Sequence, residues 1–238
     1  EIEKTDLSRL RVAATGAESV SESMLKDWQK RGILLQEVYG MTETGGVVCM
    51  AQKADLPEHM GYAGRALPYG EFKVMTSDTE EANPGELGEI WMRGASVTPG
   101  YWNRPDATEE TFVDDWLKSG DIGRKDETGR LSVEDRIKDM YISGGENVYP
   151  AEVESVLMAH PDIREVAVIG VADSKWGEIG CAVIASLSGE AVTLASVHAL
   201  CDSTLARFKW PQQIMHTEAL PRNSTGKVQK FLLRQAHS

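Results

Sequence analysis

The stretch Tyr-Gly-Met-Thr-Glu at residues 39–43 brings together side chains suited to binding a nucleotide. Tyr39 can stack on a purine, as aromatic side chains stack on bases. The Thr42 hydroxyl can donate to a phosphate, and Glu43 can hold Mg²⁺ beside phosphate oxygens. A five-residue string is a moderate signal, and taken alone it favours a plain loop over a nucleotide site.

A second candidate is Asp121, which follows Ser119 and Gly120 in an apparent tight turn. A carboxylate on such a turn can accept both hydroxyls of a ribose, as acidic residues do in dinucleotide sites. A lone Gly-Asp pair is more often a solvated turn. Asp121 therefore needs a partner elsewhere in the chain to count as a ribose ligand.

Two further segments carry glycines and a lysine in suggestive places. Gly144 and Gly145 permit turns with positive φ and close approach of a ligand, but they fit an ordinary loop before a helix equally well. Residues 220–227 (Leu-Pro-Arg-Asn-Ser-Thr-Gly-Lys) form a turn that presents Lys227 just before a last helix. A lone exposed lysine is nearly always a solvated charge.

The segment 39–43 is expected to be positioned by a strand, a helix and a second strand. Alternating apolar side chains predict a strand over 9–15, and Gly32 ends the helix that follows it. A second strand is expected over 33–38. Such a βαβ unit is right-handed with parallel strands, and ligands of parallel sheets bind at the carboxyl edge. The segments 16–18 and 39–43 are therefore expected to meet at that edge.

The remainder of the chain predicts two further bodies. Short strands and turns over about 51–134 favour a small β-barrel beside the α/β unit. After a charged connector, Pro150 begins a helix, and apolar runs over 163–171 and 179–187 predict buried strands. Thr193 is expected to cap another helix. The fold class is thus α/β followed by a compact α+β domain.

Composition excludes several function classes. The 238 residues carry a net charge of −12, which argues against nucleic acid or an anionic membrane surface as a general partner. No apolar run is long enough to span a membrane, and no signal peptide is visible. Cys49, Cys181 and Cys201 are widely spaced, which indicates buried thiols in a reducing cytosol rather than a disulfide framework or a zinc site. We therefore expect a cytoplasmic protein.

Residues 142–154 read Ile-Ser-Gly-Gly-Glu-Asn-Val-Tyr-Pro-Ala-Glu-Val-Glu. With the charged connector before it, this string resembles the hinge and glycine loop of the adenylate-forming enzymes, and it is most similar to the fatty-acyl and aryl-CoA ligases. The resemblance implies that Lys138 is the residue about which the C-terminal domain swings, and that Arg136 touches the nucleotide ribose. It also implies that Gly144 and Gly145 line the channel for the pantetheine arm of coenzyme A.

The other candidate segments match motifs of the same superfamily in the same order. By this resemblance Tyr39 lies on the adenine face, Thr42 contacts the phosphate and Glu43 binds Mg²⁺. The segment that lines the adenine pocket corresponds to Gly16, Ala17 and Glu18, and the acyl or aryl pocket begins at Gly45 and Gly46.

The resemblance also assigns the last two candidates. Arg136 follows Asp121 at the spacing of the superfamily, which favours the ribose interpretation of that carboxylate. The match around Lys227 implies that this lysine reaches the substrate carboxylate and the α-phosphate during adenylation. A cation there offsets the charge that develops as the carboxylate attacks phosphorus.

The implied activity is that of an ATP-dependent acid–CoA ligase with MgATP, coenzyme A and a small carboxylic acid as ligands. The acid attacks ATP to give acyl-AMP, and the thiol of coenzyme A then displaces AMP. The resemblance divides the chain into part of the AMP-binding domain (1–50), a β-barrel subdomain (51–135), a hinge (136–140) and a C-terminal domain (141–238). Which acid is used, and the oligomeric state, stay open.

Two departures from the superfamily limit this assignment. Ile142 occupies the position at which luciferases carry a second lysine, which speaks against light-emitting chemistry. No Ser/Thr/Gly-rich phosphate loop ending in Pro-Lys-Gly is present, so the chain, which begins at Glu1, is expected to be the inactive C-terminal portion of a longer enzyme. Two alternatives remain: an adenylation domain that loads a carrier protein, and a non-catalytic fragment.

Overall fold

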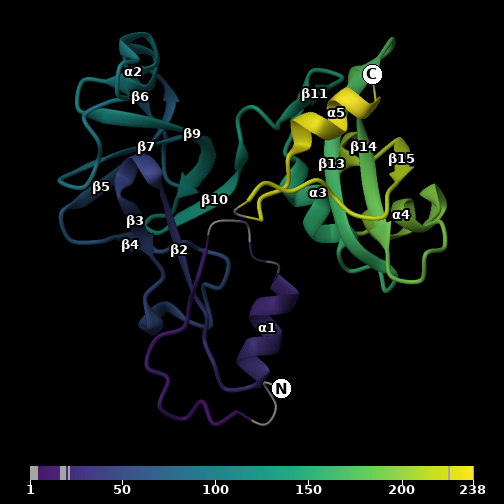
Figure 1. Ribbon diagram of the computed structural model, residues 1–238, viewed down its shortest axis with the longest axis horizontal. Helices are drawn as coiled ribbons and strands as arrows, with labels where there is room; N and C mark the ends of the chain where they lie inside the picture. The colour runs from purple at the N-terminus through teal and green to yellow at the C-terminus, as the bar shows by residue number, and fades with distance from the viewer. Residues whose placement is uncertain (1–4, 17–19, 21, 225, 238) are drawn as a thin grey trace. The chain divides into compact units, whose positions relative to one another are not determined.

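The computed structural model describes residues 5–16, 20, 22–224 and 226–237. The chain divides into two compact units, one of residues 1–119 with 123–133 and one of residues 120–122 with 134–238 (Figure 1). Ala17 and Glu18, which the sequence assigned to the adenine pocket, lie outside the described residues.

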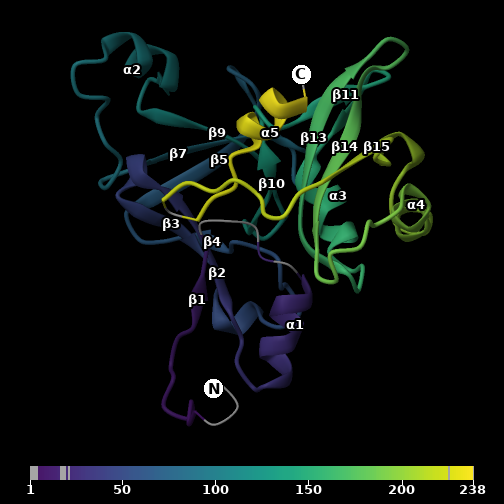
Figure 2. The ribbon, with the colours of Figure 1, turned by 45° about the vertical axis from the view of Figure 1, so that its right-hand side comes forward.

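The first unit begins with the expected βαβ arrangement. Strands β1 (Ala14–Thr15) and β2 (Gln36–Met41) are parallel, and helix α1 (Glu22–Lys30) connects them. Two antiparallel neighbours, β3 (Gly46–Met50) and β4 (Arg65–Ala66), extend this sheet in the order β1-β2-β3-β4 (Figure 2). The prediction of parallel strands is therefore confirmed, and the sheet positions the end of β2.

The two strand boundaries at this place differ from expectation. The strand predicted over 9–15 is only Ala14–Thr15, and the apolar side chains of Leu10 and Val12 are 47% and 54% exposed. Only Ala14 and Thr15 are in register with β2, so alternation upstream has no partner strand among the described residues. In contrast, β2 extends to Met41, so Tyr39 and Gly40 belong to the strand and not to the loop after it.

A six-stranded sheet forms the rest of this unit. Its order is β10-β9-β7-β5-β6, and β8 pairs with β9, so the expected barrel is an open half-barrel. The strands are β5 (Gly70–Ser77), β6 (Glu80–Glu81), β7 (Gly88–Gly94), β8 (Phe112–Val113), β9 (Trp116–Lys125) and β10 (Leu131–Arg136). Helix α2 (Pro105–Thr111) and the 3₁₀ turns η2 (Thr42–Thr44) and η3 (Lys53–Asp55) complete it. The core is the apolar face of β3, β5, β7 and β9, with Val74, Ile90, Met92 and Leu117 fully buried.

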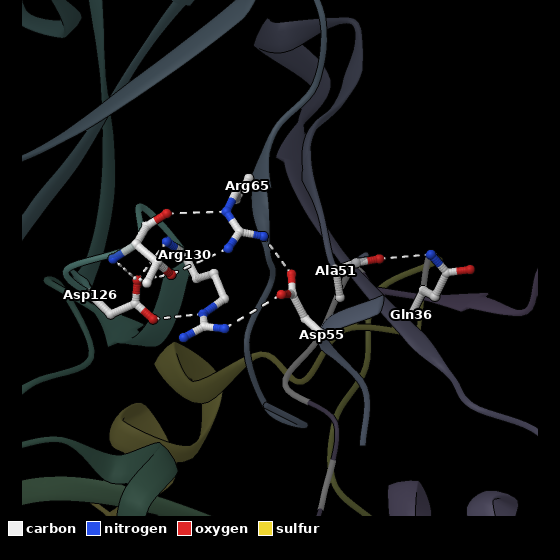
Figure 3. Close-up of polar contacts among 7 residues, drawn as sticks. Gln36, Ala51, Asp55, Arg65, Asp126 and Arg130 are labelled. Carbon is white, nitrogen blue, oxygen red and sulfur yellow. Dashed lines mark hydrogen bonds and ion pairs between the residues drawn. The ribbon is translucent and has the colours of Figure 1, made fainter. Parts of the chain in front are cut away.

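A network of charged side chains ties two loops of this unit together (Figure 3). Arg65 reaches Asp55 from β4, and Arg130 lies between Asp126 Oδ2 at 2.7 Å and Asp55 Oδ1 at 3.5 Å. Burial raises the pKa of Asp126, but hydrogen bonds from Arg130 and Thr128 outweigh it and hold that pKa below its usual value. The resulting stability is present above the unfolded pKa and is lost as pH falls through the folded pKa.

Replacing Arg130 with methionine is expected to lower the free energy of unfolding of this unit by about 1–3 kcal/mol, because Asp126 loses its cation and Asp55 loses one arginine. The side chain of Arg130 is only 11% exposed. Urea unfolding followed by tryptophan fluorescence measures the change. Arg104→Met is the matched control, since the Arg104–Asp106 pair is 64% and 67% exposed and surface pairs contribute little. An equal loss in both variants would contradict a structural role for the network.

The second unit is built on a five-stranded sheet in the order β12-β11-β14-β13, with β15 beside β14. The strands are β11 (Tyr141–Ser143), β12 (Glu146–Val148), β13 (Ile163–Asp173), β14 (Gly177–Ser186) and β15 (Gln213–His216). The helices are α3 (Pro150–Leu157), α4 (Leu194–Cys201) and α5 (Lys230–His237), with a 3₁₀ turn η4 (Arg207–Lys209). The compact α+β domain expected after the connector is therefore confirmed.

Both faces of this sheet are covered, which explains why its two long strands are continuous apolar runs. Val168 and Ile184 face α3 and α4, where Val153, Leu157 and Val197 pack. Ile169, Cys181 and Val183 face the other way and pack against Leu233 of α5. The Thr193 cap is confirmed, because its side chain accepts the backbone N–H of Ser196 at 3.2 Å.

Two expectations from composition can be compared with the structure. All three cysteines are buried, and burial raises the pKa of the Cys49 thiol to about 12 and of the Cys181 thiol to about 11. These thiols are therefore poor nucleophiles at neutral pH. Among the described helices, none combines the length and the apolar character that crossing a bilayer requires.

Candidate functional site

The end of β2 and the turn after it present the nucleotide motif. Tyr39 is half-buried against the core of the unit, while Thr42 is exposed at the start of η2. Thr44, which sequence reasoning passed over, is 1% exposed and holds this turn. Its hydroxyl accepts the N–H of Met41 at 3.0 Å and lies 2.6 Å from the carbonyl oxygen of Gly46. The only hint that the sequence offered for this role was a further threonine directly after the motif.

Glycine is needed at the positions around the motif for different geometric reasons. A Cβ on Gly40 would lie 1.9 Å from the carbonyl oxygen of Gly46, so β2 and β3 approach too closely for any other residue. Gly45 and Gly46 have φ of 67° and 117°, a region that favours glycine. A Cβ on Gly46 would meet no heavy atom of the described residues within 4 Å. This open position leaves Gly46 as a predicted boundary of an acyl pocket.

Glu43 is oriented by a residue far away in the sequence. The Tyr101 hydroxyl donates to Glu43 Oε1 at 2.8 Å, and the backbone N–H of Thr98 donates to the Glu43 carbonyl at 2.7 Å. Burial, and then the bond to the Glu43 carboxylate, raise the pKa of Tyr101, so the phenol stays protonated and remains a donor. The sequence did not predict this contact, because nothing local relates Tyr101 to Glu43.

Glu43 also passes a simple test as a metal ligand. A carboxylate has two oxygens, and the Tyr101 bond engages Oε1 only, so Oε2 can bind a cation. Within residues 5–16, 20, 22–224 and 226–237, no cluster of three or more His, Cys, Asp or Glu side chains could hold a metal. A single oriented carboxylate such as Glu43 suits Mg²⁺, which commonly binds one or two carboxylates together with substrate phosphates and water.

The first strand meets the motif as the sequence predicted. A Cβ on Gly16 would lie 2.6 Å from the carbonyl oxygen of Val38, so the chain leaving β1 passes directly beside the residue before Tyr39. Gly16 and Val38 are therefore neighbours although they lie 22 positions apart in the sequence, and the close approach requires a glycine at position 16.

Asp121 lies inside strand β9, and the prediction of a tight turn at Ser119–Asp121 was wrong. Leu117, Ser119 and Asp121 alternate as buried positions of one continuous strand, because their side chains point to the same face. Gly120 has a φ of 71° within the strand. The prediction that Asp121 and Arg136 act together is supported, since Arg136 Nε lies 3.0 Å from Asp121 Oδ1.

The connector after β10 is a compact turn. The carbonyl oxygen of Arg136 accepts the N–H groups of Asp139 and Met140 at 3.0 Å and 3.1 Å. Lys138 is exposed at the centre of this turn. Arg136 therefore stands just before Lys138 in the chain. Asp121, Arg136 and Lys138 all belong to the second unit, which is expected to hold a ribose ligand and a hinge residue.

Gly144 and Gly145 form the two-residue turn of a hairpin between β11 and β12, and not the open loop before a helix that the sequence also allowed. Their φ values of 61° and 90° are positive at both central positions, as tight hairpins prefer. Trp176 packs on this turn: its carbonyl accepts the Gly144 N–H at 2.9 Å, and a Cβ on Gly144 would lie 2.9 Å from its ring. At Gly145, by contrast, a Cβ would meet no described heavy atom within 4 Å.

The loop that carries Lys227 is closed by its own hydrogen bonds. The Lys227 N–H donates to Asn223 Oδ1 at 2.9 Å, and the Asn223 N–H donates to the Lys227 carbonyl at 2.9 Å. Gly226 has a φ of 91°, and Arg222 bridges with Val228. The prediction of a tight turn that presents Lys227 just before a last helix is therefore confirmed.

The predicted site residues thus form two groups. The first unit holds Gly16 and the motif with Tyr39, Thr42 and Glu43; the second holds the ribose pair, the hinge, the glycine hairpin and the lysine loop, with Asp121, Arg136, Lys138, Gly144, Gly145 and Lys227. The roles of these residues remain predictions.

Comparison with known proteins supports the resemblance found in the sequence. The family described as AMP-binding enzyme matches residues 1–102, and its companion, the AMP-binding enzyme C-terminal domain, matches residues 152–227. The chain belongs to the AMP-binding enzyme family. Its fold class is the one expected from the sequence.

Two curated relatives are acid–CoA ligases. Indoleacetate–CoA ligase of Aromatoleum aromaticum is 40% identical over 98% of this chain and 46% of its own length. Long-chain-fatty-acid–CoA ligase FadD13 of Mycobacterium tuberculosis is 39% identical over 100% of this chain and 47% of its own length. The chain spans about half the length of the curated relatives it matches.

Solved structures of the family share this fold. The o-succinylbenzoate CoA synthetase of Bacillus subtilis in complex with the acyl-adenylate intermediate has a TM-score of 0.91 and 35% identity, and it covers 100% of this chain and 48% of that one. The same enzyme in complex with ATP and a magnesium ion has a TM-score of 0.88, and the match covers 98% of this chain and 48% of that one.

Proposed function

We propose that this chain contributes the adenine, ribose, metal and thiol-channel elements of an ATP-dependent carboxylic acid–CoA ligase. The observation that carries the proposal is that the two curated relatives, aligned along 98% and 100% of this chain, are acid–CoA ligases. The Asp121–Arg136 pair, with Asp121 buried, and the oriented carboxylate of Glu43 support it, because such polar groups suit a nucleotide and its metal.

In the adenylation step each residue has a separate task. Tyr39 stacks on the adenine, and Asp121, oriented by Arg136, accepts the ribose hydroxyls. Thr42 donates to the α-phosphate, and Glu43 would hold Mg²⁺, which supplies charge neutralisation on the phosphates when bound. Lys227 offsets the negative charge that develops as the acid attacks phosphorus.

In the second step the thiol of coenzyme A displaces AMP from the acyl-adenylate. The proposed hinge at Lys138 exchanges the Lys227 loop for the Gly144–Gly145 hairpin. The open space beside Gly145 suits the passage of the pantetheine arm, and Trp176 packs on the neighbouring Gly144. We also propose that the protein is located in the reducing cytosol, which suits its three buried cysteine thiols.

The proposal is tested on the protein expressed from its complete coding sequence. Pyrophosphate release is measured with MgATP and a panel of fatty, aryl and indole-carboxylic acids, with coenzyme A present or absent. Release with at least one acid, and formation of its CoA thioester, is expected. A folded protein that releases pyrophosphate with none of the acids contradicts the proposal. Transfer to a phosphopantetheinyl carrier but not to coenzyme A would instead favour the carrier-loading alternative.

The 238-residue chain alone is expected to catalyse ATP–pyrophosphate exchange at less than about one-hundredth of the rate of the complete protein, because loss of even one phosphate donor costs about 10²–10³ in rate. The sequence contains no Ser/Thr/Gly-rich phosphate loop. Weak AMP binding is expected to survive, since Tyr39 and Asp121 remain, and calorimetry measures it. Exchange at a rate close to that of the complete protein would show that the phosphates need no such loop.

Replacing Gly145 with leucine is expected to slow thioester formation from pre-formed acyl-AMP by about tenfold or more while adenylation is retained, because the side chain would enter the open space beside the hairpin. Gly189→Leu is the matched control, since Gly189 also has a positive φ of 81° and open space around its Cβ. Both variants carry the same backbone strain of about 1–2 kcal/mol. An equal effect of the two would assign the loss to strain and not to the channel.

A further inference from the structure

The last helix of the second unit carries two basic side chains one turn apart, and each reaches an acidic residue of a different segment. Lys230 Nζ lies 2.7 Å from Glu154 Oε1 on α3. Arg234 Nη2 lies 3.1 Å from Asp139 Oδ1 and 3.4 Å from the Asp139 carbonyl, within the connector of residues 136–140. Helix α5 is thereby attached to the segment that contains Lys138.

These ion pairs are shielded from water. The side chains of Lys230 and Glu154 are 12% and 21% exposed, and those of Arg234 and Asp139 are 33% and 15% exposed. Glu154 Oε1 also accepts the Val168 N–H at 2.7 Å, which fixes it against β13. Shielded pairs with additional hydrogen bonds are much more costly to break than surface pairs. The contacts of α5 are therefore suited to setting its position.

The position of α5 determines that of the Lys227 loop. Only two residues separate Lys227 from the first residue of the helix, and the loop itself is closed by the two hydrogen bonds between Asn223 and Lys227. Its other end is fixed to β13, since Arg222 Nη2 lies 2.7 Å from Glu165 Oε1. The loop is therefore held between β13 and α5, and a shift of α5 moves the end that carries Lys227.

The helix does not depend on the ion pairs to stay folded onto the sheet. Leu233 is 7% exposed and packs with Leu220 and with Ile169, Val171 and Cys181 of the sheet. The apolar contact holds α5 to the domain, whereas the ion pairs involve residues of the connector and α3. Loss of a pair is thus expected to loosen the attachment of the Lys227 loop more than it lowers the stability of the whole unit.

We propose that Arg234 and Lys230 are positioning residues, which couple the Lys227 loop to the connector through Asp139 and Glu154. The coupling makes the loop and Lys138 move together, so that Lys227 arrives at the adenylation site in a defined orientation when the domain swings. The catalytic consequence rests on the proposed function; the mechanical coupling does not.

The mechanical coupling is tested on the 238-residue chain by hydrogen exchange. Arg234→Met removes the charge with little change in volume, and it is expected to speed exchange of the Asn223 and Lys227 amides by about tenfold, because the closed loop loses one attachment. Lys209→Met is the matched control, since the Lys209–Glu152 pair at 2.6 Å is in the same unit and touches neither α5 nor the connector. The charge-swapped double variant, Asp139→Arg with Arg234→Asp, is expected to restore the protection of these amides from exchange.

The catalytic consequence is tested on the protein expressed from its complete coding sequence. Arg234→Met is expected to slow adenylation by about tenfold while transfer from pre-formed acyl-AMP is unchanged, and Arg234→Lys is expected to recover most of the rate. Unchanged loop exchange in Arg234→Met, or faster exchange throughout the unit, overturns the coupling. Equal slowing of both half-reactions overturns the positioning role. Absence of adenylation in the unaltered protein counts against the proposed function and leaves the exchange result decisive for the coupling.

Discussion

Replacing Lys227 with alanine is expected to slow acyl-adenylate formation by about 10²–10³, the cost of removing one donor from a developing oxyanion. The loop around Lys227 is held by hydrogen bonds of the Lys227 backbone N–H and carbonyl to Asn223, which alanine at position 227 can also make. The variant therefore keeps the loop and loses the charge. Transfer of the acyl group from pre-formed acyl-AMP to coenzyme A is expected to be unchanged, because Lys227 has no part in that step.

The two half-reactions are measured separately, with ATP–pyrophosphate exchange for the first and thioester release from acyl-AMP for the second. Asn223→Ala provides a control in which the lysine is retained but its loop loses the bond to the Lys227 N–H. That variant is expected to show a smaller loss than Lys227→Ala. Equal loss of both half-reactions in Lys227→Ala would contradict the assignment of Lys227 to adenylation.

Replacing Glu43 with glutamine is expected to slow adenylation by about 10²–10³ as well, because the change removes the carboxylate charge that would hold Mg²⁺; a loss of about 3–4 kcal/mol of charge stabilisation corresponds to that factor. The amide oxygen of glutamine can still accept the Tyr101 hydroxyl, which lies 2.8 Å from Glu43 Oε1. The orientation of the side chain is thus preserved while its charge is not.

The measurement is adenylation rate as a function of Mg²⁺ concentration. The Glu43→Gln variant is expected to require a higher concentration of Mg²⁺ for half-maximal rate. Tyr101→Phe is the companion variant, since it retains the charge and removes the hydrogen bond that orients it, and it is expected to cause a smaller loss. If Glu43→Gln has the Mg²⁺ dependence of the unaltered protein, Glu43 is not the metal ligand.

Much of this architecture could be predicted because patterns within short stretches of the sequence determine it. The apolar runs at 163–171 and 179–187 identified two buried strands, Pro150 marked the start of α3, and the Thr193 cap marked the start of α4. Each of these signals depends on residues close together in sequence, so backbone geometry and side-chain period determine them. The motif residues of the site were found in the same way, since each motif is a short contiguous string.

The errors arose where a pattern needed a partner to be interpreted. The alternation at Leu10 and Val12 predicted a buried strand face, but only Ala14 and Thr15 pair with β2, so both side chains are exposed. Ser119 to Asp121 suggested a turn because Gly120 is flexible, yet the neighbouring strands keep β9 continuous through it. A residue's type sets what it can adopt, whereas its neighbours in space select among those states.

The amino-acid sequence therefore contained the family, the order of the motifs and most of the secondary structure. Only the tertiary structure decided the contacts that orient the motif residues: Tyr101 on Glu43, 58 positions apart, Arg136 on Asp121, 15 apart, and Arg234 on Asp139, 95 apart. Such contacts depend on which strands and helices pair, and no local periodicity encodes that choice. Hydrogen bonds and ion pairs also need distances near 3 Å, which only the folded chain provides.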